Sequence, residues 1–200
     1  MRLLALSAIL PAGATLYFFA FWRWFDYWRK HRVQTYALMF GTLLALGAAV
    51  YLLRRAVFAD RVDVPLWGQA MGWAVVAIAG VFGMVADRQI GLRVRSFTPF
   101  FEEHGRIELK TTGAYGVVRH PIYAAGVGYQ LGVFLVTGYV AVAVALPVLA
   151  LGALWFTRQE ERRLVALLDD PGDYKRYRER VPALFPWPPR TRPADDRMPR

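Results

Sequence analysis

The stretch Pro121–Thr157, PIYAAGVGYQLGVFLVTGYVAVAVALPVLALGALWFT, decides the class of fold, because its 37 residues carry no formal charge. A helix needs about 20 apolar residues to cross a hydrocarbon core of roughly 30 Å, so this stretch is long enough for two crossings. Thr137-Gly138 interrupts it near the middle. The pattern predicts a hairpin of two apolar membrane helices.

Three further segments of the chain carry no charge and have the length of a single crossing. They contain 20, 21 and 23 residues, and they are Leu3–Trp22, Val33–Leu53 and Val64–Ala86. We therefore expect an all-α integral membrane protein with about five transmembrane helices, the last two forming the hairpin.

The same pattern divides the chain into three parts. We expect three transmembrane helices in residues 1–86, and a core of loop, hairpin and C-terminal helices in residues 87–186. Five prolines over Pro186–Arg200 and the absence of apolar periodicity there indicate a disordered tail over residues 187–200.

Basic residues predict the orientation in the membrane. With five crossings, 21 Lys and Arg fall in the loops of one side and 4 in those of the other. Cytoplasmic loops carry the excess of basic residues, so the C-terminus and the loop before Pro121 are expected inside and the N-terminus outside. Arginine outnumbers lysine 22 to 3, which is typical of a GC-rich coding sequence, and we expect a bacterial inner-membrane protein.

Composition also excludes several classes of function. The chain has no cysteine, which rules out disulfides, thiolate metal sites and a cysteine nucleophile. Three scattered histidines do not suggest a metal centre. The basic residues behind the net charge of +10 lie at the ends of apolar segments and form no basic patch, so we expect a membrane partner and no nucleic acid.

Two glycine pairs have the spacing that lets membrane helices approach closely. They are Gly68 with Gly72, and Gly128 with Gly132. Simple helix packing is the favoured reading of both.

Polar chemistry is expected at the cytoplasmic start of the hairpin. Pro121 suits the first position of a helix, which places Arg119, His120 and Tyr123 beside the free N–H groups of a helix N-terminus. Such an end suits a carboxylate or a phosphate. The alternative is that Arg119 and His120 are interfacial anchors.

A second polar segment, Arg158–Leu168, continues the last apolar helix beyond the membrane. On a 3.6-residue period Glu160 shares a face with Phe156, and Glu161 lies beside Val165, while Arg158 is on the wetter face. At least one carboxylate is thus expected among apolar neighbours, where it needs a cationic partner. The alternative is an exposed helix of Glu–Arg pairs.

Asp169-Asp170-Pro171-Gly172 predicts a helix stop, and Asp173 predicts the N-cap of a short helix that runs to Arg180. On that helix Tyr174 and Tyr177 lie on one face.

These motifs, taken in order, resemble a known family. Arg119-His120-Pro121-x-Tyr123, the hairpin, Glu160-Glu161-x-x-Leu164, Tyr174-x-x-Tyr177 and Val181-Pro182 are similar to the isoprenylcysteine carboxyl methyltransferase family. Related phospholipid N-methyltransferases share the core of the pattern. The resemblance covers roughly residues 107–186.

The resemblance implies a membrane methyltransferase that binds S-adenosyl-L-methionine in its cytoplasmic loop and acts on a lipophilic substrate from the bilayer. The implied cofactor contacts are Ile107, Glu108, Leu109, Lys110, Tyr115, His120, Pro121, Ile122, Tyr123 and Glu160. Substrate contacts are implied at Arg119, Phe156, Arg158 and Glu161. No metal is implied, and no dedicated catalytic base is identified.

Two positions depart from the family pattern. Ile107 stands where many members have a histidine, and Phe156 stands where members often have a substrate-linked arginine. A lipid carboxylate, a phospholipid amine and a small thiol therefore all stay open as the methyl acceptor. The rival classes are an NADPH-dependent membrane reductase and a non-catalytic membrane scaffold.

Overall fold

The computed structural model describes residues 1–95, 109–167 and 171–186. Within these ranges the chain is helical and forms no strand beyond a single bridge between Arg61 and Tyr139. The helices, in chain order, are α1 (Arg2–Arg23), α2 (Phe25–Lys30), α3 (Arg32–Leu52), α4 (Arg54–Val57), α5 (Leu66–Arg95), α7 (Ala114–Val117), α8 (Pro121–Thr137), α9 (Val140–Leu167) and α10 (Pro171–Arg180).

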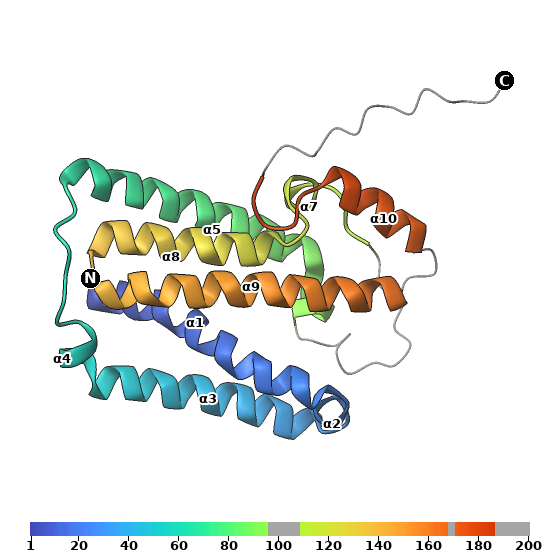
Figure 1. Ribbon diagram of the computed structural model, residues 1–200, viewed down its shortest axis with the longest axis horizontal. Coiled ribbons are helices and arrows are strands. Elements are labelled where there is room, and N and C mark those ends of the chain that lie inside the picture. The colour runs from blue at the N-terminus through green and yellow to red at the C-terminus, as the bar shows by residue number, and fades with distance from the viewer. Residues whose placement is uncertain (96–108, 168–170, 187–200) are drawn as a thin grey trace.

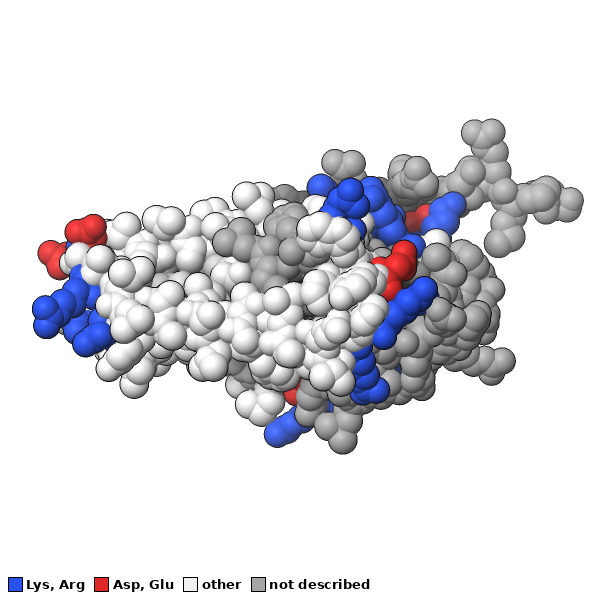
Figure 2. Space-filling view, turned by 90° about the horizontal axis from the view of Figure 1, so that it is seen from below, with Lys and Arg blue, Asp and Glu red and all other residues white. Residues whose placement is uncertain are grey.

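The long helices lie side by side in the order α5, α8, α9, α1, α3, with the short helices α7 and α10 at one end (Figure 1). Three are long and apolar enough to cross a membrane, namely α3, α5 over Leu66–Ile90 and α9 over Val140–Arg162. Shorter apolar helical stretches are Arg2–Gly13 and Pro121–Thr137. On the face that Figure 2 shows, the charged side chains of the described residues gather toward the two ends, and the white region between them carries none.

Helices α5 and α8 pack through two glycines that face each other. A Cβ on Gly132 would lie 2.8 Å from the carbonyl oxygen of Gly72, and one on Gly72 would lie 2.9 Å from that of Gly132. Gly128 is close to Ala79, whereas Gly68 lies against Val64 just before its own helix. One member of each predicted glycine pair therefore forms the close contact.

The connection between α8 and α9 is fixed by the loop that follows α4. Helix α8 ends at Thr137, at the predicted interruption, and Gly138 follows with φ +67°. Val62 N–H donates to the Gly138 carbonyl at 2.8 Å, and Arg61 Nε donates to the Thr137 carbonyl at 2.7 Å. A side chain at position 138 would collide with the Val62 carbonyl, so glycine is required there.

Two helices differ from the boundaries that the sequence predicted. Helix α5 continues to Arg95, nine residues past the end of its charge-free segment. Helix α10 begins at Pro171, which places Asp173 in its first turn rather than at its N-cap. The predicted tail, residues 187–200, lies outside the described residues.

Candidate active site at the α7–α10 end

The site is built where the chain enters α8. Arg119 N–H donates to the Pro182 carbonyl at 2.8 Å, and His120 N–H donates to the Ala183 carbonyl at 3.0 Å. These bonds tie the segment after α10 to the start of α8. Pro121 then begins the helix, which has no side-chain hydrogen bond at its N-cap.

Glu161 on α9 is the centre of an ionic cluster. Its Oε1 accepts hydrogen bonds from Arg119 Nε at 2.9 Å and from Nη2 at 2.7 Å. The side chains of Arg119 and Glu161 are only 8% and 10% exposed. Arg119 Nη1 also donates to the carbonyls of Arg178, at 3.1 Å, and Val181. The buried carboxylate expected from the sequence is thus Glu161, and its cationic partner is Arg119.

His120 lies between the two glutamates. Its Nε2 is 3.2 Å from Glu161 Oε1, and its Nδ1 is 3.4 Å from Glu160 Oε2. Burial disfavours the charged imidazole, but the hydrogen bonds and charges of Glu160 and Glu161 outweigh burial and raise the pKa of His120 above its usual value. The two carboxylates therefore stabilise the protonated form of His120 relative to a free imidazole.

Glu160 has an unused acceptor at this place. Its side chain is 47% exposed as a whole, yet Oε2 is buried, and its contact with His120 Nδ1 at 3.4 Å is too long for a hydrogen bond of good geometry. A buried carboxylate oxygen held by an ion pair alone can accept a further hydrogen bond. The arrangement suits a ligand that brings an N–H or O–H group to Glu160.

Helix α7 forms the outer wall of the site and is held by α5. Ala114 N–H donates to Gln89 Oε1 at 3.0 Å, at the part of α5 that extends past the charge-free segment. The Tyr115 carbonyl accepts from Tyr177 Oη on α10 at 2.6 Å. Burial raises the pKa of the Tyr115 phenol to about 12, and the Glu160 charge adds to the effect. Tyr115 is therefore a neutral hydrogen-bonding group and not a base.

An aromatic wall, made of Tyr123, Phe156 and Trp22, continues from the ionic cluster toward the membrane. The rings of His120 and Tyr123 are stacked with centroids 5.9 Å apart. Phe156, which is 8% exposed, lies 6.4 Å from Tyr123 and 6.3 Å from Trp22 of α1. The cluster thus borders an apolar surface built by three helices.

The structure unites some of the predicted residues and separates others. It brings together Arg119, His120, Glu160 and Glu161, and places Tyr123 and Phe156 beside them. Arg158 is exposed, and it makes no hydrogen bond or ion pair with the described residues of this cluster. Leu109 is half-buried and Lys110 is exposed, Pro121 is buried and Ile122 is 39% exposed. Ile107 and Glu108 lie outside the described residues.

Three contributors were not predicted from the sequence. Gln89 was missed because it follows charged residues that look like the start of a loop. Arg178 was missed because it is one of several exposed arginines on α10; its Nε lies 3.7 Å from Glu161 Oε2. Trp22 was missed because nothing in its local sequence indicates the contact with Phe156.

The fold and this site define a class, namely a helical membrane protein with a buried ionic cluster at one end of its bundle. The family model described as phospholipid methyltransferase matches residues 67–168, just over half of the chain. The chain therefore belongs to the phospholipid methyltransferase family. The match runs from α5 to the end of α9 and so includes His120, Glu160 and Glu161.

The chain is also similar to a curated methyltransferase. Over 126 residues the chain is 33% identical to the methanethiol S-methyltransferase of Crocosphaera subtropica (strain ATCC 51142 / BH68), a match that covers 59% of this chain and 44% of that protein. The chain thus spans less than half the length of this relative. No solved structure matches the chain.

Proposed function

We propose that the protein is an S-adenosylmethionine-dependent membrane methyltransferase that acts on a lipophilic acceptor at the α7–α10 end of the bundle. The observation that carries this proposal is the buried Glu160 Oε2, which is paired with His120 at 3.4 Å and has no hydrogen bond of good geometry. Bound S-adenosylmethionine supplies an electrophilic methyl group, and its amino or ribose hydroxyl group would donate the further hydrogen bond that this oxygen can accept.

The residues present fit the cofactor. Its carboxylate suits the N-terminus of α8, which no side chain caps, and its α-amino or ribose group suits Glu160. His120 holds Glu160 in place, because its Nδ1 faces that carboxylate. Tyr115 and Tyr123 suit the adenosine. The remaining proposed contacts, from the family resemblance, are Ile107, Glu108, Leu109, Lys110, Pro121 and Ile122.

The acceptor is proposed to lie against the aromatic wall and to enter from the bilayer. The buried Phe156 and the half-buried Trp22 make the surroundings of the ionic cluster apolar, which suits a lipid chain or another apolar group. Holding acceptor and methyl donor in reacting geometry supplies up to about 7–11 kcal/mol of the barrier reduction. The likeness to isoprenylcysteine carboxyl methyltransferases makes a lipid carboxylate the first candidate acceptor.

A small thiol is the second candidate, and the two arginines near the acceptor favour it. Arg119 is already paired with Glu161, and Arg158 is exposed, so neither is placed as a free counter-ion for a substrate carboxylate. A thiol binds as a neutral molecule without such a counter-ion, and it must release its proton to become the thiolate that accepts the methyl group. The name of the relative, methanethiol S-methyltransferase, points the same way.

The proposal also includes the topology of the protein in the membrane. We place α1 and α8 as crossings in addition to α3, α5 and α9, with the site in the cytoplasm and the N-terminus outside. The excess of basic residues at the end that carries the site supports this orientation.

The cofactor assignment is tested by calorimetry on the protein in mild detergent. Wild-type protein should bind S-adenosylmethionine and S-adenosylhomocysteine, and Glu160→Gln should weaken binding at least tenfold, because the amide replaces a charged acceptor. Glu179→Gln, a change at an exposed carboxylate of α10, is the matched control and should bind normally. Binding of NADPH in place of both sulfur compounds would refute the proposal.

The acceptor is identified with the same preparation. Methyl transfer from labelled cofactor is measured to a prenylated cysteine, to phosphatidylethanolamine and to a short alkyl thiol. Transfer to the prenylated cysteine alone supports the carboxylate reading, and transfer to the thiol alone supports the second candidate. Cofactor binding without transfer to any of the three would refute both.

A further inference from the structure

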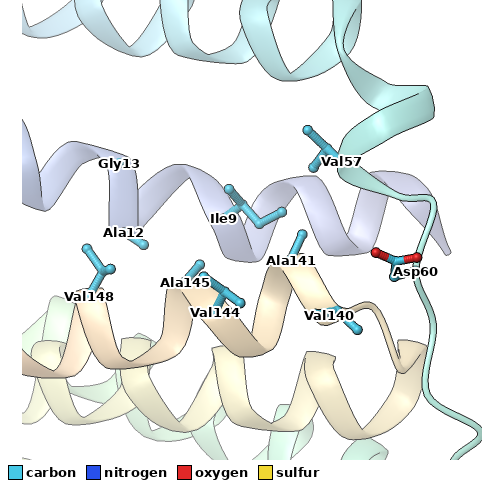
Figure 3. A pocket seen from close by; sticks show the side chains of 10 residues that line it. All are labelled: Ile9, Ala12, Gly13, Val57, Asp60, Val140, Ala141, Val144, Ala145 and Val148. Atoms are coloured by element: carbon cyan, nitrogen blue, oxygen red, sulfur yellow. The ribbon is translucent and has the colours of Figure 1, made fainter.

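A groove lies at the opposite end of the bundle from the candidate active site. It has a volume of about 410 Å³ and runs between α1, α9 and the segment that begins with α4 (Figure 3). Its lining is Ile9, Ala12, Gly13, Val57, Asp60, Val140, Ala141, Val144, Ala145 and Val148. Val148 and Glu160 are twelve residues apart on α9, a separation of about 18 Å, so this groove is not part of the active site.

Small side chains on two neighbouring helices create the groove. Ala12 of α1 points toward α9, whose Ala141 and Ala145 point toward α1 (Figure 3). Val144, on the same wall, is 64% exposed, so the groove opens on the outer surface of the bundle. In a bilayer that surface meets hydrocarbon chains, and the groove has the apolar lining that a chain requires.

The groove ends at a carboxylate. Asp60 is the one charged residue of the lining, and it lies where α4 leads into the loop before α5. No other described side chain is paired with the Asp60 carboxylate. An exposed arginine, Arg55, lies on the same short segment. An apolar channel with a negative group at its mouth complements a lipid that has an apolar chain and an ammonium headgroup.

From this complementarity we infer that the groove binds one acyl chain of an amine-headed zwitterionic phospholipid, with the lipid ammonium against Asp60. The bound lipid fills the space between α1 and α9 and is not a methyl acceptor, because its headgroup lies at the far end of the bundle. This inference is independent of the proposed function and goes beyond it.

The test measures lipid binding to delipidated protein by native mass spectrometry. Palmitoyl-oleoyl phosphatidylethanolamine and the phosphatidylglycerol of the same chains are titrated separately. Wild-type protein should bind the amine lipid about threefold more tightly, the effect of a partly exposed ion pair. Asp60→Asn should remove this preference, and the matched control Asp63→Asn, at an exposed carboxylate outside the lining, should keep it.

Ala145→Phe fills the groove and should weaken binding of both lipids at least tenfold, with an unchanged circular dichroism spectrum. Val144→Trp, at the exposed wall, is the second blocking variant and should do the same without disturbing the helix interface. Three results would each overturn the inference, namely tighter binding of phosphatidylglycerol by wild type, a preference that survives in Asp60→Asn, or full binding in both blocking variants.

Discussion

Removal of the Glu161 carboxylate should destabilise the protein more than removal of its neighbour Glu160. Glu161 accepts two hydrogen bonds from Arg119 and lies within 3.2 Å of His120 Nε2. In Glu161→Ala the Arg119 guanidinium, 8% exposed, keeps its bonds to the carbonyls of Arg178 and Val181 but loses its counter-charge.

The magnitude follows from this environment. Removing one partner of a buried ion pair destabilises a protein by about 3–5 kcal/mol. Arg119 keeps two hydrogen bonds to carbonyls, so we expect a loss near the lower limit, about 3 kcal/mol of unfolding free energy. For a chain of this size 1 kcal/mol lowers the Tm by about 2–4 °C, so the expected fall is about 6–12 °C. The variant Glu161→Gln keeps an acceptor but not the charge, and its Tm should fall by about half as much.

The assay is thermal unfolding in detergent, followed by intrinsic tryptophan fluorescence. Glu160→Gln is the internal comparison, because that side chain is 47% exposed and its loss should change the free energy of unfolding by less than about 1 kcal/mol. A Glu161→Ala protein with the Tm of wild type would refute the reasoning. So would a Glu160→Gln protein that is equally destabilised.

Two further outcomes are expected. Gly132→Ala should lower the free energy of unfolding by about 1–3 kcal/mol, because the new Cβ would lie 2.8 Å from the Gly72 carbonyl oxygen and push α5 away from α8. Gly126→Ala is the control, because a Cβ there meets nothing within 4 Å. The raised pKa of His120 contributes stability that is fully present below its unfolded pKa of about 6.5 and is lost as the pH rises through the higher folded value. The Tm of the cofactor-free protein should therefore fall across that window, and His120→Gln should flatten the profile; equal slopes in both proteins would contradict the assignment.

The positions of the apolar helices could be predicted from the sequence because they depend on local composition. The segment Val33–Leu53 corresponds to α3 within one residue at each end, and α8 ends at the predicted Thr137. The extension of α5 to Arg95 could not be predicted in this way, because charged residues after Ala86 end a hydropathy segment without ending a helix. A contact to a distant part of the chain, Gln89 with Ala114, accompanies the extension.

The sequence was sufficient to predict which residues belong to the candidate site, but not how they are arranged. The sequence indicated His120 and the glutamate pair, but helical periodicity alone did not decide which carboxylate is buried. That choice depends on Arg119, 42 residues away, and on how far α9 is rotated toward α8. The tie between Arg119 and the segment after α10 has no local signal, because it is made by backbone carbonyls.

The bonds from Arg119 and His120 to Pro182 and Ala183 also bear on the order of biosynthesis. A ribosome makes α8 and α9 before it makes residues 181–183, and domains form from the N-terminal side during synthesis. The membrane bundle is therefore complete while Arg119 still awaits its last partners. A nascent chain halted before Val181 would be inserted but would lack the bonds that join the start of α8 to residues 181–183, so this end of the bundle closes last.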